Sequence, residues 1–399
     1  MDVKIQESIR KVIQNHFSEM QNIRRQIHQN PELSFEEFET ASFIEKQLTI
    51  LGLSSTRMAK TGVVGYLGDA KKGKTLALRA DIDALPIHEK NNTEYVSKNI
   101  GVMHACGHDV HTTWLLGALK ALKAIENHLS GQIKFIFQPG EEKIPGGASL
   151  LIQEGVLNDV DFILGQHTMP LLDVGHFGFR SGLYMASADE IYIRIHGKGG
   201  HGAHPNSLVD PVTCMAQIIN ALQQVVSRKA KPSIPSVLSF GKVIANGATN
   251  IVPDSVEMIG TFRTYDEAWR FEAHNWIKKI AANTAVALGC ETEIEIKVGY
   301  PFLENNTSMN ELVKKNAKAW YPQNQIHDLE LWPAGEDFSF YAQEIPAVFY
   351  RCGIRNIEKG ITSHLHTPTF DIDEEALVNG AEMMAWQAYK LLQENEKIQ

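Results

Sequence analysis

The strongest constraint on the fold is a series of short apolar segments that alternate with helical patterns and end in polar turns. Apolar residues spaced by three or four positions, as on one face of a helix, occur from Ile9 to Ile23 and from Phe38 to Leu48. The strand-like segments are TGVVGYLG (61–68), TLALRADIDALP (75–86), GQIKFIFQPGEE (131–142) and VDFILGQHT (160–168), and a further helical pattern occupies 112–129. This alternation predicts an α/β fold with a mixed, largely parallel sheet.

The middle of the chain has a different order of predicted elements. Between residues 186 and 299 the order is strand, helix, two strands, helix and strand. A β-α-β-β-α-β order is typical of the ferredoxin-like fold, so we expect a second domain inserted into the first. The predicted domains are therefore 1–185 together with 300–399, and 186–299.

The composition is that of a globular protein and excludes several classes. Hydrophobic residues make up 43% of the 399 residues and charged residues 21%. With a net charge of −9 and no basic run, the chain is not expected to bind nucleic acid. The first 20 residues interrupt their apolar positions with charges, unlike a signal peptide, and no segment approaches the length of a membrane span. The four cysteines lack secreted-type spacing, which favours reduced thiols and a cytoplasmic location.

The segment HACGHDVH, residues 104–111, concentrates side chains that can bind a metal. Cys106 and His108 form a Cys-x-His pair just before a helical pattern. A thiolate and an imidazole suit zinc or a similar borderline cation. Short Cys/His clusters also occur in cores and at helix ends, so the pair alone is weak evidence.

Further donors follow the later strand-like segments. Glu141 and Glu142 lie at the polar end of one of them, where adjacent acids are often only a solvated turn. If one carboxylate binds a metal, its neighbour points elsewhere and is free to take a proton from water. His167 lies at the end of the next segment, where its ordinary role would be a hydrogen-bonded buried histidine, and His364 and His366 precede the last helical pattern.

These donors are too many for one tetrahedral ion with an open position. Two ions about 3.5–4 Å apart with a bridging ligand would accommodate five donors. The set that we consider is Cys106, His108, Glu142, His167 and His366.

Nine motifs occur in order along nearly the whole chain. They are PELSFEE, RADIDALP, MHACGHDVH, FQPGEE, GQHT, GKGGHGAHP, NIVPDSVEMIGTFR, GEDFSF and LHTPTF. In this combination the sequence resembles the dinuclear-metal amidohydrolase branch of the aminoacylase and glutamate-carboxypeptidase superfamily. That branch contains hippurate hydrolases, bacterial N-acyl-amino-acid amidohydrolases, N-acetyldiaminopimelate deacetylases and plant indole-acetyl-amino-acid hydrolases.

The resemblance assigns roles to the candidate residues. It implies that Glu141 is the general base, and it favours His366 over His364 as a ligand. It also implies that Asp83 helps to orient the site, with Asp81 as a second candidate for that task. The metal ligands that it implies are Cys106, His108, Glu142, His167 and His366.

One departure from more distant relatives concerns the ligand that bridges the metals. Those relatives have a histidine ligand where this chain has Asp81, and a bridging aspartate where it has ACGHD. The difference indicates that Cys106 bridges the two metals here.

The predicted second domain carries three further candidates. In GKGGHGAHPNS, glycines flank His201 and permit close approach of the backbone, although such a segment is often only a turn. The resemblance implies a lid and dimerisation domain whose histidine reaches the partner subunit's active site and stabilises an oxyanion. Asn250 and Arg263 are candidates for binding a substrate carboxylate, because the planar guanidinium favours bidentate contacts, and a surface ion pair is the alternative for Arg263.

The combined hypothesis is a metal-dependent hydrolase that cleaves the amide bond of N-acyl amino acids. It would use two divalent ions per chain (Zn, Mn, Co or Ni) and form a homodimer, with no nucleic-acid or membrane partner. A metallo-carboxypeptidase or dipeptidase acting on short peptides is the alternative within the same superfamily. A binding module with a structural metal is a third possibility, but a structural site needs no spare carboxylate such as that of Glu141. No serine stands in a nucleophile elbow motif.

Overall fold

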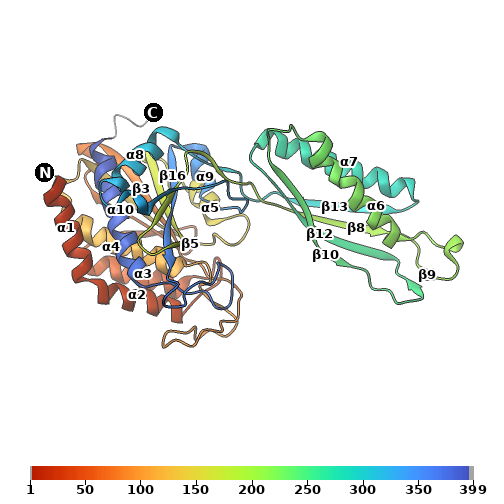
Figure 1. Cartoon of the computed structure of the whole chain (residues 1–399), viewed down its shortest axis with the longest axis horizontal. Helices are drawn as coiled ribbons and strands as arrows, with labels where there is room; N and C mark the ends of the chain where they lie inside the picture. Colours follow the sequence, from red (N-terminus) through yellow and green to blue (C-terminus); the bar gives the residue numbers. More distant parts are fainter. Residues whose placement is uncertain (1, 395–399) are drawn as a thin grey trace. The chain divides into compact units, whose positions relative to one another are not determined.

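The computed structural model describes residues 2–394, which form two compact units (Figure 1). The first contains the described residues up to Tyr184, Glu304–Glu330 and the residues from Asp337 onward. The second contains Met185–Leu303 and Leu331–Glu336. The predicted range of 186–299 therefore lacks residues 331–336, which join the second unit by packing from far along the chain. Two short strands, β7 (Gly182–Met185) and β14 (Leu303–Asn305), occur where the chain passes between the units.

The first unit is built on an eight-stranded sheet in the order β1-β2-β4-β3-β5-β16-β6-β15. Its strands are β1 (Ser55–Met58), β2 (Gly62–Gly68), β3 (Lys74–Asp81), β4 (Gly131–Gln138), β5 (Phe162–Asp173), β6 (Phe177–Phe179), β15 (Ile326–Asp328) and β16 (Ala347–Arg355). The central strands β4, β3, β5 and β16 are mutually parallel. At one edge β2 pairs antiparallel with β4 and with β1, and at the other β6 pairs antiparallel with β16 and parallel with β15. The predicted mixed, largely parallel sheet is confirmed.

Helices cover this sheet. They are α1 (Asp2–Asn15), α2 (Phe17–Gln29), α3 (Phe38–Ile50), α4 (His108–Ala124), α5 (Gly147–Gln153), α8 (Thr307–Lys318), α9 (Ser339–Glu344) and α10 (Glu375–Gln393). The single apolar stripe from Ile9 to Ile23 spans two helices, because His16 interrupts the helix without disturbing the spacing of the buried positions. The helix predicted over 112–129 begins earlier, at His108.

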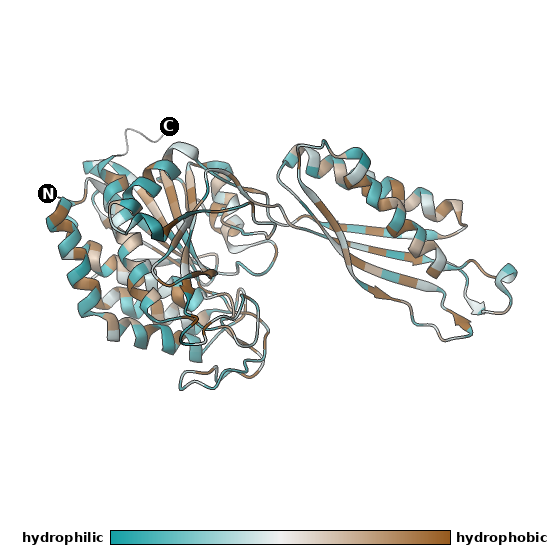
Figure 2. Ribbon diagram, viewed as in Figure 1, coloured by the Kyte–Doolittle hydropathy of each residue, from teal (hydrophilic) through white to brown (hydrophobic). Residues whose placement is uncertain are grey.

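Helices α4 and α10 form the centre of the helical layer and are buried on almost all sides. Trp114 of α4 donates a hydrogen bond from Nε1 to the carbonyl of Ala376 at 2.7 Å. Gly380 of α10 permits this approach, since a Cβ there would lie 2.3 Å from the Trp114 ring. In Figure 2 the strands of this unit are largely brown, as expected for parallel strands buried on both faces.

Buried charges join α2 to the first turn of α4. Asp109 accepts hydrogen bonds from Arg24 Nε and from His28 Nδ1, each at 2.8 Å, and all three side chains are fully buried. One acid of the HACGHDVH segment is therefore used to pack two helices together.

The second unit has a four-stranded antiparallel sheet in the order β10-β12-β8-β13, with two helices on one face (Figure 1). Its chain order is β-α-β-β-α-β. On β8, Ile191, Ile193 and Ile195 are buried toward the helices, while Tyr192 and Arg194 alternate with them on the other face. The elements are β8 (Asp189–His196), α6 (Pro211–Gln224), β10 (Ser236–Ile244), β12 (Ser255–Thr264), α7 (Glu267–Ala287) and β13 (Glu291–Lys297), with a small pair β9 (Gly200–His201) and β11 (Ile251–Val252). A role as a lid or dimerisation domain stays a prediction.

No helix within residues 2–394 combines the length and the apolar character that a membrane crossing requires.

Candidate metal centre

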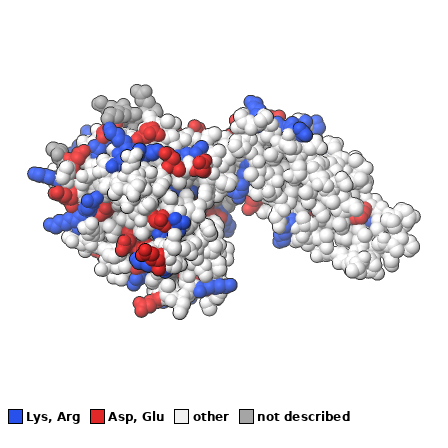
Figure 3. Space-filling view, viewed as in Figure 1, with Lys and Arg blue, Asp and Glu red and all other residues white. Residues whose placement is uncertain are grey.

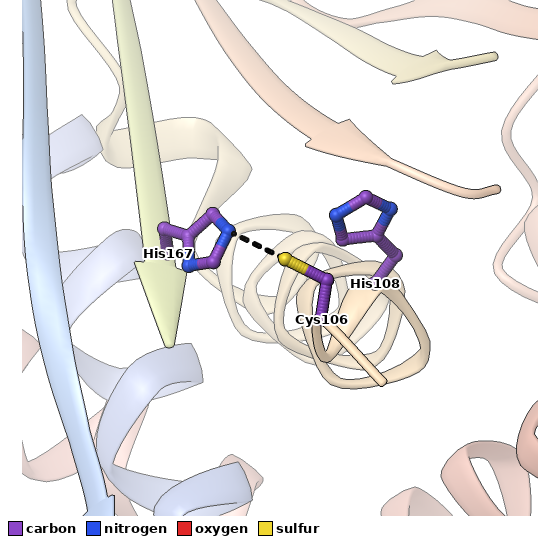
Figure 4. Close-up of side chains that lie close together, drawn as sticks. All are labelled: Cys106, His108 and His167. Carbon is purple, nitrogen blue, oxygen red and sulfur yellow. Dashed lines mark hydrogen bonds between the residues drawn. The ribbon is translucent and has the colours of Figure 1, made fainter. Parts of the chain in front are cut away.

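The candidate ligands gather beyond the carboxyl ends of neighbouring parallel strands. Asp83 follows β3, and Glu142 follows β4. The sequence predicted His167 at the end of its strand. Strand β5 instead continues beyond Gly165, the last residue that pairs with β3, so His167 lies within β5. Ligands of α/β proteins bind at this edge of the sheet. In Figure 4, Cys106 and His108 enter from the segment that leads into α4 and lie opposite His167.

All five predicted ligands lie close together. The Cys106 Sγ atom is 3.4 Å from Nε2 of His167 and 3.3 Å from Nε2 of His366. Oε1 of Glu142 is 3.1 Å from His366 Nε2 and 4.0 Å from His108 Nε2. The donors form two groups, Cys106–His108–His167 and Cys106–Glu142–His366, and within each group the donor atoms lie within 4.8 Å of one another. The two groups share Cys106, which is the arrangement that a bridging thiolate requires.

Two buried donor atoms test whether a cation fits these residues. His108 Nε2 and Glu142 Oε1 are inaccessible to solvent and make no hydrogen bond of acceptable geometry within the described part of the chain, although His366 Nε2 lies 3.1 Å from Glu142 Oε1. Buried polar atoms in proteins are almost always satisfied. Because both atoms lie in the donor groups, divalent cations there would satisfy them.

The pKa of Cys106 reflects its burial beside several carboxylates. Burial raises the pKa of the Cys106 thiol well above its ordinary value, and the carboxylates of Glu142 and Glu141 raise it further. A divalent cation would reverse this balance by stabilising the thiolate. Burial lowers the pKa of His167 well below its ordinary value, which keeps the imidazole neutral, as a ligand must be.

Asp83 orients one ligand and anchors the backbone of another. Its Oδ1 lies 3.1 Å from Nδ1 of His108, so the other ring nitrogen of His108 faces the donor group. Its Oδ2 accepts hydrogen bonds from Ser34 Oγ at 2.6 Å and from the backbone N–H of Glu142 at 3.0 Å. Burial alone would lower the pKa of His108, but Asp81 and the hydrogen bond to Asp83 raise it to about 10. A cation bound at Nε2 would therefore displace a proton from this ring.

Asp81 belongs to a supporting network and not to the donor groups. Its Oδ1 lies 2.5 Å from His111 Nδ1, and its Oδ2 accepts from Arg79 Nη1 at 2.7 Å. His111 Nε2 accepts from the backbone N–H of Thr168 at 2.9 Å. Asp81, His108 and His111 are close enough together to hold an ion, but both ring nitrogens of His111 already have partners. This group therefore fixes the position of its neighbours.

Sequence reasoning missed His111 and Arg79, although both carry a recognisable signal. His111 lies three residues after His108, on the same face of a helix, and Arg79 lies two residues before Asp81, on the same face of a strand.

Glu141 is buried beside the ligands. A carboxylate oxygen of Glu141 lies within 4.8 Å of the donors of His108 and Glu142. The backbone N–H of Asp337 donates to Glu141 Oε1 at 3.4 Å. Asp337 is itself fixed by a buried ion pair with Arg79 at 2.8 Å, which connects the loop after β4 to β3.

His366 approaches Cys106 from the loop before α10. It has φ 59°, in the left-handed region that is unusual for a residue other than glycine, and such strain is concentrated at functional sites. Its N–H donates to the carbonyl of Ala105 at 2.8 Å, next to Cys106. His364 is exposed and lies outside the donor groups. The structure thus brings His366, and not His364, to the cluster.

The candidates in the second unit are more exposed. His201 lies on β9, and its ring nitrogen Nδ1 accepts only from the nearby N–H of Ala203 at 3.1 Å among the bonds described. The carbonyl of Asn250 accepts from Gly202 N–H at 2.8 Å, so Asn250, which precedes β11, lies close to His201. Few charged side chains occur at the β9 end of the unit on the face shown in Figure 3.

Arg263 lies near the other end of β12 and is half-buried. Its Nη1 donates to the carbonyl of Pro333 at 3.1 Å. The structure therefore does not bring Arg263 together with His201 and Asn250 within the second unit.

The fold and the site define a class of protein. Thiol, imidazole and carboxylate donors in two groups, beside a further buried carboxylate at the ligand-binding edge of an α/β sheet, are the features of a metal-dependent hydrolase.

The chain belongs to peptidase family M20/M25/M40, whose model matches residues 77–388. It is 41% identical over 295 residues to an N-acyl-L-amino acid amidohydrolase of Geobacillus stearothermophilus. This match covers 74% of this chain and 80% of the relative. It is 38% identical over 363 residues to thermostable carboxypeptidase 2 of Saccharolobus solfataricus, covering 90% and 92%. The crystal structure of a dinuclear metal binding peptidase from the M20 family of Bacillus subtilis superimposes with a TM-score of 0.81 at 34% identity, covering 95% and 99%. The predicted family and the predicted class, a hydrolase of amide bonds, are confirmed.

Proposed function

We propose that this protein hydrolyses the amide bond of N-acyl amino acids with two divalent metal ions per chain. The observation that carries the proposal is the pair of donor groups that share Cys106 and lie beside the buried carboxylate of Glu141. The similarity to an N-acyl-L-amino acid amidohydrolase supports the substrate class.

Five side chains would hold the ions. His108 and His167 would bind one ion, Glu142 and His366 the other, and the Cys106 thiolate would bridge them. Bound divalent ions polarise the scissile carbonyl and acidify the attacking water, so that a carboxylate can deprotonate that water near neutral pH.

Glu141 acts as the general base. It takes the proton from the attacking water on a carboxylate oxygen and then delivers it to the leaving nitrogen, which departs as the free amine of the amino acid. The hydrogen bond from the Asp337 backbone and the burial of Glu141 keep its carboxylate directed at the ligand cluster. Asp83 holds His108 in the ligand orientation through Nδ1.

The second unit would supply substrate contacts in a homodimer. His201 would stabilise the oxyanion in the partner subunit's active site, and Asn250 and Arg263 would bind the substrate carboxylate. The exposure of His201 and Asn250 supports roles that require contact outside their own unit. We also expect a cytoplasmic location, which the four buried, unpaired cysteines support.

A carboxypeptidase or dipeptidase is the second candidate, and the similarity to a carboxypeptidase favours it. Release of free amino acid from hippurate, N-acetyl amino acids and dipeptides distinguishes the two functions. The protein should be stripped of metal and reloaded with Zn²⁺, Mn²⁺, Co²⁺ or Ni²⁺ before each assay. Faster turnover of dipeptides than of every acyl amino acid with each metal would contradict the first proposal.

Metal stoichiometry provides an independent test. Fully active protein should bind two ions per chain, and Cys106→Ala should weaken both binding steps in a calorimetric titration. Full activity at one equivalent of metal would contradict a dinuclear centre.

A further inference from the structure

The loop that carries Glu141 and Glu142, which we call the PGEE loop (residues 139–142), rests on a segment from far earlier in the chain. This support segment, residues 34–37, lies just before α3. The carboxylate of Glu37 accepts a hydrogen bond from the backbone N–H of Gly140 at 2.8 Å. Two residues further on, the N–H of Glu142 donates to the carboxylate of Asp83. Ser34 of the support segment donates to the same carboxylate, so Asp83 connects the segment to Glu142. Two alternate N–H groups of the loop are thus fixed.

Close packing reinforces these hydrogen bonds. Gly140 has φ +59°, and a Cβ at this position would lie 2.3 Å from Cε1 of Phe35. Phe35 itself has φ 68°, a conformation that costs energy for a bulky residue. The ring of Phe35 therefore occupies the space that a side chain at position 140 would need.

Glu37 has no contact with solvent and uses both carboxylate oxygens. One accepts from Gly140 N–H, and the other accepts from the Thr61 hydroxyl at 2.7 Å. Burial and the nearby carboxylate of Asp83 raise the pKa of Glu37 to about 7. The contact that Glu37 makes with the loop is that of a hydrogen-bond acceptor. A glutamine has the same shape and can accept from Gly140 while donating to Thr61.

We propose that Glu37 is a positioning residue that holds the PGEE loop so that Glu141 and Glu142 face the metal donors. This inference rests on the proposed function, because it assigns Glu37 to the reaction that Glu141 performs.

The first experiment compares Glu37→Ala with Glu37→Gln in steady-state hydrolysis of the best acyl amino acid. Glu37→Ala should lower kcat at least about 10-fold, since loss of a supporting contact displaces a catalytic group, while KM stays within about 3-fold. Glu37→Gln should restore most of kcat. Wild-type kcat in folded Glu37→Ala, or equal losses in both variants, would overturn the proposal.

Glu382→Ala is the matched control. Glu382 is also buried, but it accepts from Trp320 and Tyr321, away from the ligand cluster. Its removal should lower the melting temperature without changing kcat. A loss of kcat equal to that of Glu37→Ala would show that any lost buried carboxylate has this effect, and would overturn the proposal.

The second experiment requires no substrate. Co²⁺ bound to a thiolate and a carboxylate gives visible absorption bands that depend on ligand geometry. Glu37→Ala should shift these bands, whereas Glu37→Gln and Glu382→Ala should keep the wild-type spectrum. If the wild-type protein hydrolyses no acyl amino acid or peptide, the proposed function fails, and the Co²⁺ spectrum still decides the role of Glu37: an unchanged spectrum in Glu37→Ala overturns it.

A third variant perturbs the same contact from the opposite side and keeps the test decisive if Glu37→Ala does not fold. Gly140→Ala should push the loop from Phe35 and lower kcat at least about 10-fold, as Glu37→Ala does. Gly101→Ala is its control, because Gly101 also has positive φ but a methyl group there would have no neighbouring atom within 4 Å. If Gly140→Ala behaved like Gly101→Ala, the proposal would be wrong.

Discussion

The candidate residues of the two units differ in how they are fixed. Around Cys106 in the first unit, ligands and the proposed base are mostly buried, and Asp83 and Asp81 each bind several neighbours. In the second unit, His201 and Asn250 are exposed and have mainly local partners. The first unit thus holds its reactive groups in place before substrate arrives, whereas the second unit presents groups whose proposed contacts form only with substrate and a partner.

This difference has an energetic consequence. Removing one partner of a buried charge pair costs about 3–5 kcal/mol, because the other charge stays buried without compensation. Exposed residues without special contacts usually change stability by less than about 0.5 kcal/mol. Substitutions of the proposed ligands and of the carboxylates that support them should therefore affect metal binding or stability together with activity, and those at His201 should affect activity alone.

The largest effect is expected for Glu141→Gln. Glutamine keeps the shape of the side chain but cannot take a proton, so turnover should fall about 10²- to 10⁴-fold. The metals should remain bound, because Glu141 is not among the proposed ligands. Turnover and metal content should be measured on the same preparation. A variant that has lost its metals, or one that keeps them and is nearly as active as the wild type, would contradict the assignment.

His201→Ala tests the exposed half of the comparison. Removal of one oxyanion donor typically costs about 10²- to 10³-fold in kcat. Metal content and melting temperature should not change, because the side chain is exposed. The neighbouring exposed residue His204, whose ring lies 5.5 Å from that of His201, provides the control variant His204→Ala. Unchanged turnover in His201→Ala would remove this residue from the mechanism.

Glu142→Gln should act on metal affinity. The neutral amide is a poorer ligand than a carboxylate, so affinity for the ion bound with His366 should fall about 10- to 100-fold. Competition with a chromogenic chelator measures this change. Because Glu141→Gln makes the same chemical change one residue away, equal affinities in the two variants would show that Glu142 is not a ligand.

Much of the fold and the donor set could be predicted from the sequence because their signals are local. The apolar segments of β3, β4 and β5 each lead into a polar segment, and parallel strands bring such segments to one edge. The resemblance selected His366 over His364, and the structure places His366 beside Cys106.

The parts that were not predicted depend on contacts between distant segments. Glu37 belongs to a recognised motif, PELSFEE, yet its partner Gly140 lies more than 100 residues later, and no periodic pattern connects them. The same holds for Arg79 and Asp337, and for residues 331–336, which pack with the second unit. The break at His16 was missed because it preserves the apolar spacing on both sides.

The smallest effect concerns the pH dependence of stability in the first unit. The folded protein raises the pKa of Glu37 from 4.5 to about 7, so between these values the folded state holds a proton that the unfolded state releases. This contribution to stability is complete below pH 4.5 and is lost as the pH rises through about 7. Relative to Glu37→Gln, which does not titrate, wild-type protein should lose about 1 kcal/mol of unfolding free energy between about pH 5 and pH 6. Urea denaturation in the presence of a chelator removes any contribution from metal binding. If the unfolding free energies of the two proteins changed in parallel with pH, the pKa of Glu37 would not be raised. The side chain of Glu37 would then be more accessible to water than its burial indicates.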